Sequence, residues 1–450
     1  MRYKDKKVLV CGMGKSGISA ARLLCRHGAR VTLTDTKATP VVDADLLADE
    51  RVSTYFGKDP DDIVSDFDIL VISPGISVYA PFVDIARRAG VAVLGEIEIA
   101  SAVCDAPVIA ITGTNGKTTT VSMVGDIMQN FAKSKHSRVV GNIGVPFCDE
   151  AEDIPADAFV VAEISSFQLE TIADFRPKIS AVLNMTEDHL DRHITMENYI
   201  AAKERIFENQ QAEDFCVLNY DNDITRSMAA KTAAQVIFFS KQPLDSGVFV
   251  RDNSICINWG GRQGEIMKCA DLPVPGSHSL ENAMAAAAMA AVAGVPIEAI
   301  AQSLRDFKAV EHRQEFVREL RGVRFYNDSK ATNVDSAIVG ITAMSRPIIL
   351  IGGGQGKDQD FSGLVAAFGD RIKSFIIMGE AAEELSKICR EHDFVDYEIV
   401  KDMKSAVNTA FAQASKGDCI LLSPACASMD MFDNFEHRGR VFKEIVTGLR

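Results

Sequence analysis

The chain has 450 residues, 47% of them hydrophobic, which is enough to bury a large core and predicts a division into three domains. Its formal net charge of −14 argues against nucleic acid and membrane surfaces as partners, because both are polyanionic and require a basic face. The ten cysteines form no C-x-x-C pair, and neither a targeting segment nor a long apolar span is recognisable. We therefore expect a reduced, cytoplasmic protein without zinc, disulfides or membrane insertion.

The first block, residues 1–96, alternates short β-branched runs with amphipathic stretches. We expect a helix from Ala20 to His27, and strands at KKVLVCG, ARVTLTD, DILVISPG and AVLGE. Such alternation predicts a parallel sheet with crossover helices, that is, an α/β domain of the Rossmann-like kind.

Two glycine turns follow strands of this block. Gly12, Gly14 and Gly17 spell G-x-G-x-x-G, and Asp35 ends the next strand. Alone this fingerprint predicts a nicotinamide enzyme. Its physical basis, however, is the binding of a nucleotide diphosphate at a helix N-terminus, and a UDP-sugar supplies such a diphosphate equally well. The second turn, SPGI at residues 73–76, should lie beside the first at the carboxyl edge of the sheet. The alternative is that the glycines serve only the turns.

The second block, residues 97–308, opens with the most informative run of the chain, ITGTNGKTTT at residues 111–120. Backbone N–H groups freed by its glycines suit anionic oxygens, Lys117 suits the outer phosphates, and the Thr118 hydroxyl suits Mg²⁺ at a helix N-terminus. Ile111 stands where the strict P-loop pattern requires glycine, so this is a shortened variant. The run predicts a central P-loop-type α/β domain that binds ATP.

Four polar residues of the second block have a functional and an ordinary interpretation. Glu163 ends an apolar strand, where a carboxylate is costly unless it meets a metal or a cation. Asn142 lies in a tight GNIG turn. His189 lies on a loop, where histidines without a role are common, and Lys203 is flanked by apolar helix residues, a setting typical of a surface lysine.

The third block, residues 309–450, follows an alanine-rich helix expected near residues 281–293 and restarts the strand pattern. VRFYNDS, PIILIGGG, SFIIMGE and DCILLSPA are the expected strands, separated by helix-like segments. This predicts a second Rossmann-like α/β domain at the C-terminal end.

The motifs GTNGKTT, GNIG, EISSFQLE, NMTEDHLDRH, AAKERIF, EHRQEF, NDSKATN and SPACASMDMFDNFEHRG together resemble, in order, those of the Mur ligases of bacterial cell-wall synthesis. The similarity runs from the first glycine turn nearly to the end of the chain and is greatest to the branch that adds D-glutamate. The Asp-Asn-Pro element of the diaminoacid-adding members is absent from this sequence. Folylpolyglutamate synthetases share the central loop but lack the N-terminal UDP domain.

The resemblance implies roles at matching positions. UDP-N-acetylmuramoyl-L-alanine would be held by Lys15, Ser16, Asp35, Thr36, Lys37, Gly75, Asn142 and His189. ATP would be held by Gly113, Thr114, Asn115, Gly116, Lys117, Thr118, Thr119, Asn282, Arg313 and Asp328. One position departs from the family, because Ser279 stands where the HNxxN element often has its first Asn.

The same resemblance implies a D-glutamate site and a metal centre. D-Glutamate would be held by Lys330, Thr332, Lys357, Ser428 and Phe435. Two Mg²⁺ ions would lie at Thr118, Glu163, His189 and Lys203, with Lys203 converted by CO₂ into a carbamate. The catalytic residues would be Lys117, His189, Lys203 and Lys330.

The expected reaction joins D-glutamate to UDP-N-acetylmuramoyl-L-alanine through an acyl phosphate with release of ADP, in a chain that acts as a monomer. A sibling ligase with another amino acid is the closest alternative. A nicotinamide oxidoreductase is more remote, because it leaves the GKTT loop unexplained. A nucleoside triphosphatase acting as a regulatory module would hydrolyse ATP without substrate.

Overall fold

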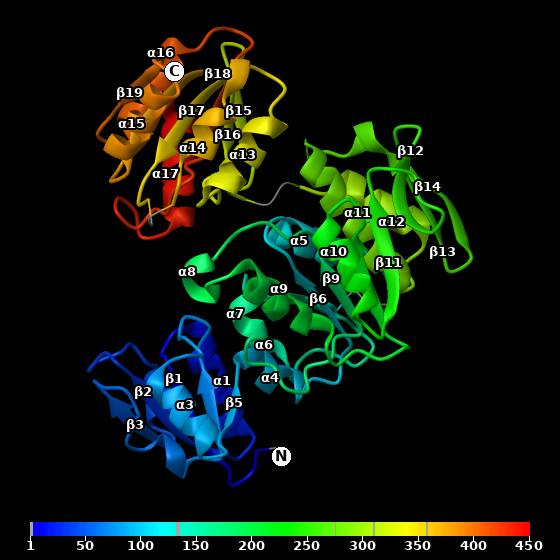
Figure 1. Ribbon diagram of the computed structural model, residues 1–450, viewed down its shortest axis with the longest axis vertical. Helices are drawn as coiled ribbons and strands as arrows, with labels where there is room; N and C mark the ends of the chain where they lie inside the picture. The colour runs from blue at the N-terminus through cyan, green and yellow to red at the C-terminus, as the bar shows by residue number, and fades with distance from the viewer. Residues whose placement is uncertain (1–2, 132–135, 275, 309–310, 357–358) are drawn as a thin grey trace. The chain divides into compact units, whose positions relative to one another are not determined.

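The computed structural model describes residues 3–131, 136–274, 276–308, 311–356 and 359–450. The chain divides into two compact units, Met1–Asp271 with Glu281–Asp306, and Leu272–Leu280 with Phe307–Arg450 (Figure 1). Within the described residues the strands form three sheets of five, nine and six strands. None of the helices found there has the length and apolar character that a bilayer crossing requires.

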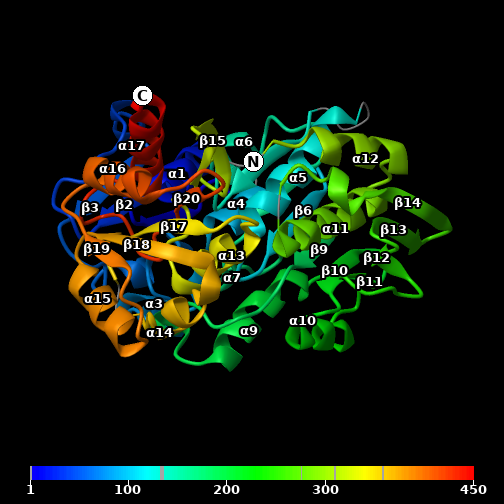
Figure 2. The same cartoon turned by 90° about the horizontal axis from the view of Figure 1, so that it is seen from above.

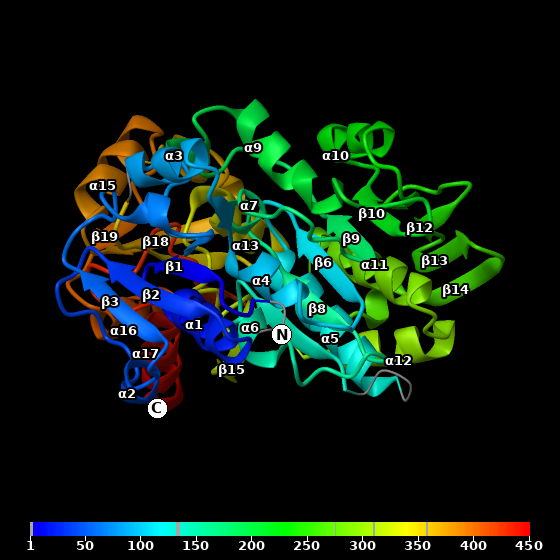
Figure 3. The same cartoon turned by 90° about the horizontal axis from the view of Figure 1, so that it is seen from below.

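The first sheet is parallel and has the strand order β3-β2-β1-β4-β5. Helices α1 (Lys15–Arg26) and α3 (Pro81–Arg88) lie on opposite sides of this sheet (Figure 3). Their apolar residues belong to two separate clusters, one on each face. The glycine turns follow β1 and β4 at the carboxyl edge. The strands are β1 (Lys7–Cys11), β2 (Arg30–Asp35), β3 (Val52–Phe56), β4 (Ile69–Ile72) and β5 (Ala92–Leu94).

The central sheet belongs to the same compact unit and has the order β14-β13-β12-β11-β10-β9-β6-β8-β7. Its strands from β7 to β12 run parallel, and β12, β13 and β14 pair antiparallel at one end. The strands are β6 (Val108–Thr112), β7 (Arg138–Gly141), β8 (Val160–Glu163), β9 (Ile179–Val182), β10 (Phe215–Asn219), β11 (Gln235–Ser240), β12 (Gly247–Arg251), β13 (Ser254–Trp259) and β14 (Arg262–Lys268).

Helices cover both faces of the central sheet. Figures 2 and 3 show α5, α11 and α12 on one side and α7, α9 and α10 on the other. Their bounds are α5 (Lys117–Asn130), α7 (Ser166–Leu169), α9 (Met196–Glu204), α10 (Asp223–Ser227), α11 (Ser277–Val292) and α12 (Ile297–Asp306). Three short helices, α4 (Glu96–Ser101), α6 (Phe147–Glu150) and α8 (Leu190–His193), lie between strands.

The third sheet lies in the second unit and has the order β15-β16-β20-β17-β18-β19, parallel except for the β15–β16 pair. Two apolar clusters sandwich it, one with α13, α14 and α15 and one with α16 and α17 (Figure 2). The strands are β15 (Glu315–Leu320), β16 (Val323–Asn327), β17 (Ile348–Gly353), β18 (Ile372–Met378), β19 (Tyr397–Ile399) and β20 (Cys419–Leu422). The helices are α13 (Val334–Ala343), α14 (Ser362–Ala366), α15 (Ala382–Glu391), α16 (Met403–Gln413) and α17 (Phe435–Gly448).

The expected fold class of three α/β domains with parallel sheets is confirmed, and every strand expected from the sequence is present. The first helix was placed wrongly at its start, since α1 begins at Lys15, directly after the extended Gly14. Its first turn is polar or glycine and carries no apolar signal. The antiparallel β12–β14 extension was not foreseen. The domain limits 1–96, 97–308 and 309–450 stay a prediction.

Candidate active site

The phosphate loop connects the buried strand β6 to α5, as its sequence predicts. Gly113 and Gly116 have φ of 150° and 83°, backbone conformations that favour glycine. A Cβ on Gly116 would lie 2.3 Å from Oδ1 of Asn282, so this turn has no room for a side chain. The expected ATP residue Asn282 is therefore brought against the loop.

Strand β9 and the loop after it brace the phosphate loop. Asn184 accepts a hydrogen bond from the Asn115 N–H at 2.9 Å and donates to the Asn115 carbonyl at 3.0 Å. The Thr114 hydroxyl donates to the Thr186 carbonyl at 3.1 Å. The loop backbone is thus fixed from two sides, which leaves the N-terminus of α5 as a preorganised anion site.

Two lysines converge on the carbonyl of Gly113. The Lys117 ammonium donates to it at 2.9 Å and to the Thr114 carbonyl at 2.7 Å. The Lys203 ammonium donates to the same Gly113 oxygen at 2.9 Å and lies 4.8 Å from the centre of the Tyr199 ring. Lys203 is 1% exposed, and burial together with the charge of Lys117 lowers its pKa well below the usual value. A lowered pKa favours the neutral form of this amine, which is the form that reacts with CO₂.

Glu163 is fully buried at the end of β8, and one of its two carboxylate oxygens accepts a hydrogen bond. Its Oε1 accepts a hydrogen bond from the Asn142 amide at 2.8 Å, whereas Oε2 has no hydrogen-bond partner among the described atoms. An unpaired buried carboxylate oxygen is costly unless a cation meets it. The chemistry of this pair, together with the neighbouring Lys203, fits an oxygen-liganded Mg²⁺.

His189 lies in the loop before α8 and is half exposed. Its φ of 54° is left-handed, and its ring lies 4.8 Å from the ring of Phe167, centre to centre. The preceding Asp188 accepts a hydrogen bond from the His189 N–H at 2.9 Å. The ring also contacts Tyr199, which in turn contacts Lys203, so the predicted residues His189 and Lys203 share one neighbour.

The two glycine turns of the first sheet lie side by side, as predicted. The Ser73 hydroxyl donates to the Gly12 carbonyl at 2.9 Å, and a Cβ on Gly17 would lie 2.0 Å from that same carbonyl oxygen. Asp35 accepts hydrogen bonds from the N–H groups of Met13 and Lys37, at 2.8 and 2.9 Å. In this structure Asp35 therefore organises the turns. The other expected UDP residues of this sheet are exposed at its carboxyl edge or, for Ser16, half-buried: Lys15, Ser16, Thr36, Lys37 and Gly75.

In the second unit, two of the residues expected to hold D-glutamate, Lys330 and Phe435, lie close together. The Lys330 ammonium lies 5.5 Å from the centre of the Phe435 ring, and the Ser329 hydroxyl donates to the Phe435 carbonyl at 2.8 Å. Ser428 is buried in the turn after β20, and Thr332 is half-buried. Lys357 lies outside the described residues.

Of the residues expected at the adenine end, Asn282 belongs to the first unit and Arg313 and Asp328 belong to the second. Asp328 is 1% exposed, and burial raises its pKa to about 6, against the opposing charge of Arg313. The Ser423 hydroxyl and the Gln314 N–H donate to its two oxygens, at 2.8 and 3.2 Å. Asp328 is thus firmly oriented within its own unit.

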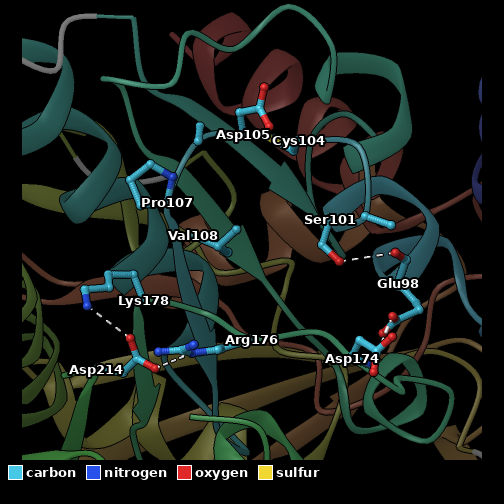
Figure 4. Close-up of a pocket in the computed structure, with 12 residues that line it drawn as sticks. Glu98, Ser101, Cys104, Asp105, Pro107, Val108, Asp174, Arg176, Lys178 and Asp214 are labelled. Atoms are coloured by element: carbon cyan, nitrogen blue, oxygen red, sulfur yellow. Dashed lines mark hydrogen bonds and ion pairs between the residues drawn. The ribbon is translucent and has the colours of Figure 1, made fainter. Parts of the chain in front are cut away.

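A pocket of about 420 Å³ lies elsewhere on the first unit (Figure 4). It includes the start of β6 and the residues just before β9 and β10, so it lies at the sheet edge opposite the phosphate loop. Asp214 in it pairs with Arg176 at 2.6 Å and with Lys178 at 3.1 Å, and Glu98 accepts three backbone N–H groups. Asp214 is thus paired with two cations and Glu98 with backbone N–H groups, so the pocket is no competitor for the active site.

Sequence reasoning missed several residues that hold the site together. Tyr199 and His193 are buried with their ring centres 5.1 Å apart, and Arg192 links α8 to the SPGI turn. The fully buried Arg438 donates to the carbonyls of Ser329 and Ala427, which belong to two of the loops expected to hold D-glutamate. An arginine or histidine within a short helix carries no sequence signal for such long-range contacts.

The fold and the site define a class of protein. Three parts define it: an α/β domain whose glycine turns suit a diphosphate, a second with a phosphate loop beside the buried Lys203, and a third α/β domain. Together they are the parts of a multidomain enzyme that uses a nucleoside triphosphate.

Comparison with known proteins identifies the family. The chain matches the Mur ligase MurD-like N-terminal domain over residues 6–95, the Mur ligase middle domain over 111–290, and the Mur ligase glutamate ligase domain over 312–426. It is 45% identical to a UDP-N-acetylmuramoylalanine–D-glutamate ligase of Alkaliphilus oremlandii over 455 residues, and 45% identical to that of Clostridioides difficile over 457, covering 100% of each chain. The chain belongs to the Mur ligase family.

A solved structure shares the whole fold at low identity. The UDP-N-acetylmuramate-alanine ligase of Thermotoga maritima is similar with a TM-score of 0.60 at 17% identity, covering 98% of this chain and 99% of that one. This likeness concerns the fold alone, and it agrees with the three α/β domains described above.

Proposed function

We infer that the protein is an ATP-dependent ligase that joins D-glutamate to UDP-N-acetylmuramoyl-L-alanine in peptidoglycan synthesis. The observation that carries this inference is the identity of 45% over the full length of ligases with that name. The phosphate loop with Lys117 and the paired glycine turns supply the groups that such substrates need. The enzyme acts in the cytoplasm as a monomer.

The UDP-substrate is held by the first unit. Its diphosphate lies against the glycine turns at Gly75 and the N-terminus of α1, where backbone N–H groups and the helix dipole favour anions. Asn142 and His189 reach its sugar and alanyl end. The remaining contacts come from Lys15, Ser16, Asp35, Thr36 and Lys37.

ATP phosphates bind the loop at residues 113–119, and the adenine end meets Asn282, Arg313 and Asp328. Thr118, Glu163, His189 and carbamylated Lys203 would hold two Mg²⁺ ions. The unpaired Oε2 of Glu163 supports this set, because a buried carboxylate oxygen becomes favourable only with a cation nearby. The lowered pKa of Lys203 supports it too, because the neutral amine is the form that CO₂ converts into an anionic carbamate. When bound, the metal supplies charge stabilisation at the phosphoryl oxygens.

D-Glutamate is held in the second unit by Lys330, Thr332, Lys357, Ser428 and Phe435. Two lysines with hydroxyl groups and the N-terminus of α17 suit a dicarboxylate in an otherwise acidic protein. The ring of Phe435 keeps Lys330 oriented.

The reaction has two steps. The alanyl carboxylate attacks the γ-phosphorus of ATP, the bond to ADP breaks, and an acyl phosphate forms, with Lys117 and Lys330 neutralising the developing charge. The D-glutamate amine then attacks the acyl carbon and phosphate leaves. His189 is half exposed and takes the proton that the incoming ammonium must lose. Exclusion of water protects the acyl phosphate from hydrolysis.

The test is phosphate release with ATP, Mg²⁺ and UDP-N-acetylmuramoyl-L-alanine, with D-glutamate, L-glutamate, L-lysine and meso-diaminopimelate offered separately. Release that requires D-glutamate is the expected result. Dependence on another amino acid would assign the chain to a sibling activity. Release without any amino acid would overturn the ligase assignment.

A further inference from the structure

Arg192, in the short helix α8 of the central domain, reaches into the SPGI turn of the first sheet. Its Nη1 donates to the Pro74 carbonyl at 2.8 Å, and its Nη2 donates to the Ile76 carbonyl at 3.0 Å. These two carbonyls flank Gly75, where the UDP diphosphate is proposed to bind. The side chain of Arg192 is 12% exposed, so the contact is largely shielded from water.

The same guanidinium is fixed from the other side by α7 and the residue that follows it. Nη2 also donates to Oε2 of Glu170 at 2.6 Å, and the guanidinium carbon lies 4.2 Å from the centre of the Phe167 ring. A planar guanidinium can make all of these contacts at once, and charge-assisted hydrogen bonds are the strong ones. A lysine ammonium has neither the reach nor the geometry for both carbonyls and the carboxylate.

Two series of side-chain contacts connect Arg192 to the proposed reaction centre. Phe167 packs against the His189 ring at an inclined angle, so the ring that lies over the Arg192 guanidinium also contacts the proposed base. Glu170 lies 3.5 Å from His193, and the His193 ring contacts the Tyr199 ring, whose face lies against Lys203.

The backbone around Arg192 is strained at both ends of α8. His189 and Ile194 have φ of 54° and 70°, values that a β-branched residue such as Ile194 adopts only when its surroundings impose them. The Ile194 side chain is 70% exposed, so its own burial does not hold this conformation. The contacts of Arg192 and His193, which lie within this segment, hold the strained conformation instead.

We propose that Arg192 is a positioning residue that fixes the UDP-binding turn relative to His189 and Lys203, so that a substrate held by its diphosphate presents its carboxylate correctly. This rests on the proposed UDP site at Gly75. Binding energy from a remote part of a substrate is then converted into orientation at the reacting centre, which raises kcat.

The experiment compares Arg192→Gln, Arg192→Lys and Glu170→Gln with the unaltered enzyme. Titration calorimetry gives the affinities for UDP and for a non-hydrolysable ATP analogue, and kcat is measured with all substrates saturating. We expect kcat to fall by about 10- to 100-fold in both Arg192 variants, because small displacements of reacting groups have effects of that size. Both affinities should stay within about twofold, that is, within about 0.4 kcal/mol.

Arg87→Gln is the matched control. Arg87 donates from α3 to the Val78 carbonyl at 2.9 Å, so it too braces the chain after the SPGI turn, but from within the first sheet's own domain. Its loss should leave kcat unchanged. Glu170→Gln keeps an acceptor for Arg192 without its charge and should lower kcat less than either Arg192 variant.

Three results would overturn the proposal. An unchanged kcat in Arg192→Gln would show that the contact has no role in the reaction. Weaker UDP binding at unchanged kcat would make Arg192 part of the UDP site itself. A lower melting temperature with loss of both affinities would make it purely structural. Failure of the UDP site is separately visible, because Gly75→Asp would then leave UDP affinity unchanged in the enzyme with Arg192 intact.

Discussion

At the scale of single residues, the site is governed by what burial does to charge. Lys203 and Lys117 both donate to the Gly113 carbonyl, and only Lys203 is fully buried. Two ammonium groups this close repel each other, and the buried one gives up its proton more easily. Conversion of Lys203 into an anion removes this repulsion and provides a partner for Lys117.

Replacing Lys203 with Met should lower kcat by at least about 100-fold, because a positioned charge in a water-poor site is lost. Enzyme equilibrated with ¹³C-bicarbonate should show a carbamate carbon resonance that the variant lacks. Added short carboxylic acids should partly restore the activity of Lys203→Ala. The exposed Lys231, paired with Glu204, is the control, and Lys231→Met should keep both signal and activity. An active enzyme without the resonance would contradict the carbamate.

Glu163→Gln tests the metal centre through the unpaired Oε2. The amide keeps the size of the side chain and its contact with Asn142 but removes the charge. We expect the Mg²⁺ concentration for half-maximal activity to rise at least about tenfold, equivalent to about 1.4 kcal/mol, with little change in melting temperature. Glu150→Gln, a half-buried carboxylate paired with Arg138, should leave the Mg²⁺ dependence unchanged. If Glu163→Gln and Glu150→Gln showed the same Mg²⁺ dependence of activity, Glu163 would be excluded as a ligand of the metal.

At the scale of elements, α4 shows how a short helix joins two sheets of one unit. Glu96 accepts the Cys148 N–H at the start of α6 at 2.6 Å, and Glu98 accepts the N–H groups of residues 173–175. Both carboxylates are buried, and burial raises the pKa of Glu96 to about 7. The helix therefore carries a group that responds to pH far from the active site.

The sign of that response follows from proton binding. Between about pH 4.5 and 7 the native state keeps the Glu96 proton and the unfolded chain loses it, so the free energy of unfolding falls as pH rises. The loss amounts to about 3 kcal/mol across this window. Glu96→Gln should match the native protein near pH 4.5 and exceed its stability by up to about 3 kcal/mol at pH 8, in urea unfolding. A variant of the exposed Glu50 should show no such difference.

Helix α17 contains a glycine, Gly439, at a position where the adjacent His312 ring leaves no room for a side chain. A Cβ on Gly439 would lie 2.2 Å from Nδ1 of His312, a buried ring, whereas a Cβ on Gly448 in the same helix would meet nothing within 4 Å. Gly439→Ala should therefore destabilise the protein by about 1–3 kcal/mol, although alanine favours helices. Gly448→Ala should be neutral or stabilising by up to about 1 kcal/mol in denaturant unfolding. Equal effects of the two substitutions would show that the His312 ring moves aside freely.

The elements also show what the sequence could predict. Gly113, Gly116 and Glu163 were found because a turn or a strand end gives each a local signature. Arg192 and Glu98 were not, because the backbone groups that they bond lie 75 or more residues away in the chain. Lys203 was ambiguous from periodicity alone, and only family resemblance distinguished it from a surface lysine. Burial and long-range pairing are properties of the fold, which local patterns do not encode.

At the scale of the whole molecule, the proposed ligands divide between the two compact units. The residues proposed for the UDP-substrate lie in the first unit, and the described ones proposed for D-glutamate lie in the second. Those proposed for ATP belong to both, since Asn282 and the phosphate loop lie in the first unit and Arg313 and Asp328 in the second.

Amide hydrogen exchange with UDP alone tests this division. UDP at about 100 times its dissociation constant stabilises the states that bind it by about 2.7 kcal/mol. Amide exchange that requires opening of the site should therefore slow by up to about 100-fold. We expect this slowing at residues 12–17 and 73–76 and none within Phe307–Arg450. Uridine, which lacks the diphosphate, should protect the glycine turns less, because their N–H groups and the α1 dipole act on charge. Equal protection of the second unit by UDP would mean that its residues contribute to the UDP site, and the assignment of substrates to units would have to be redrawn.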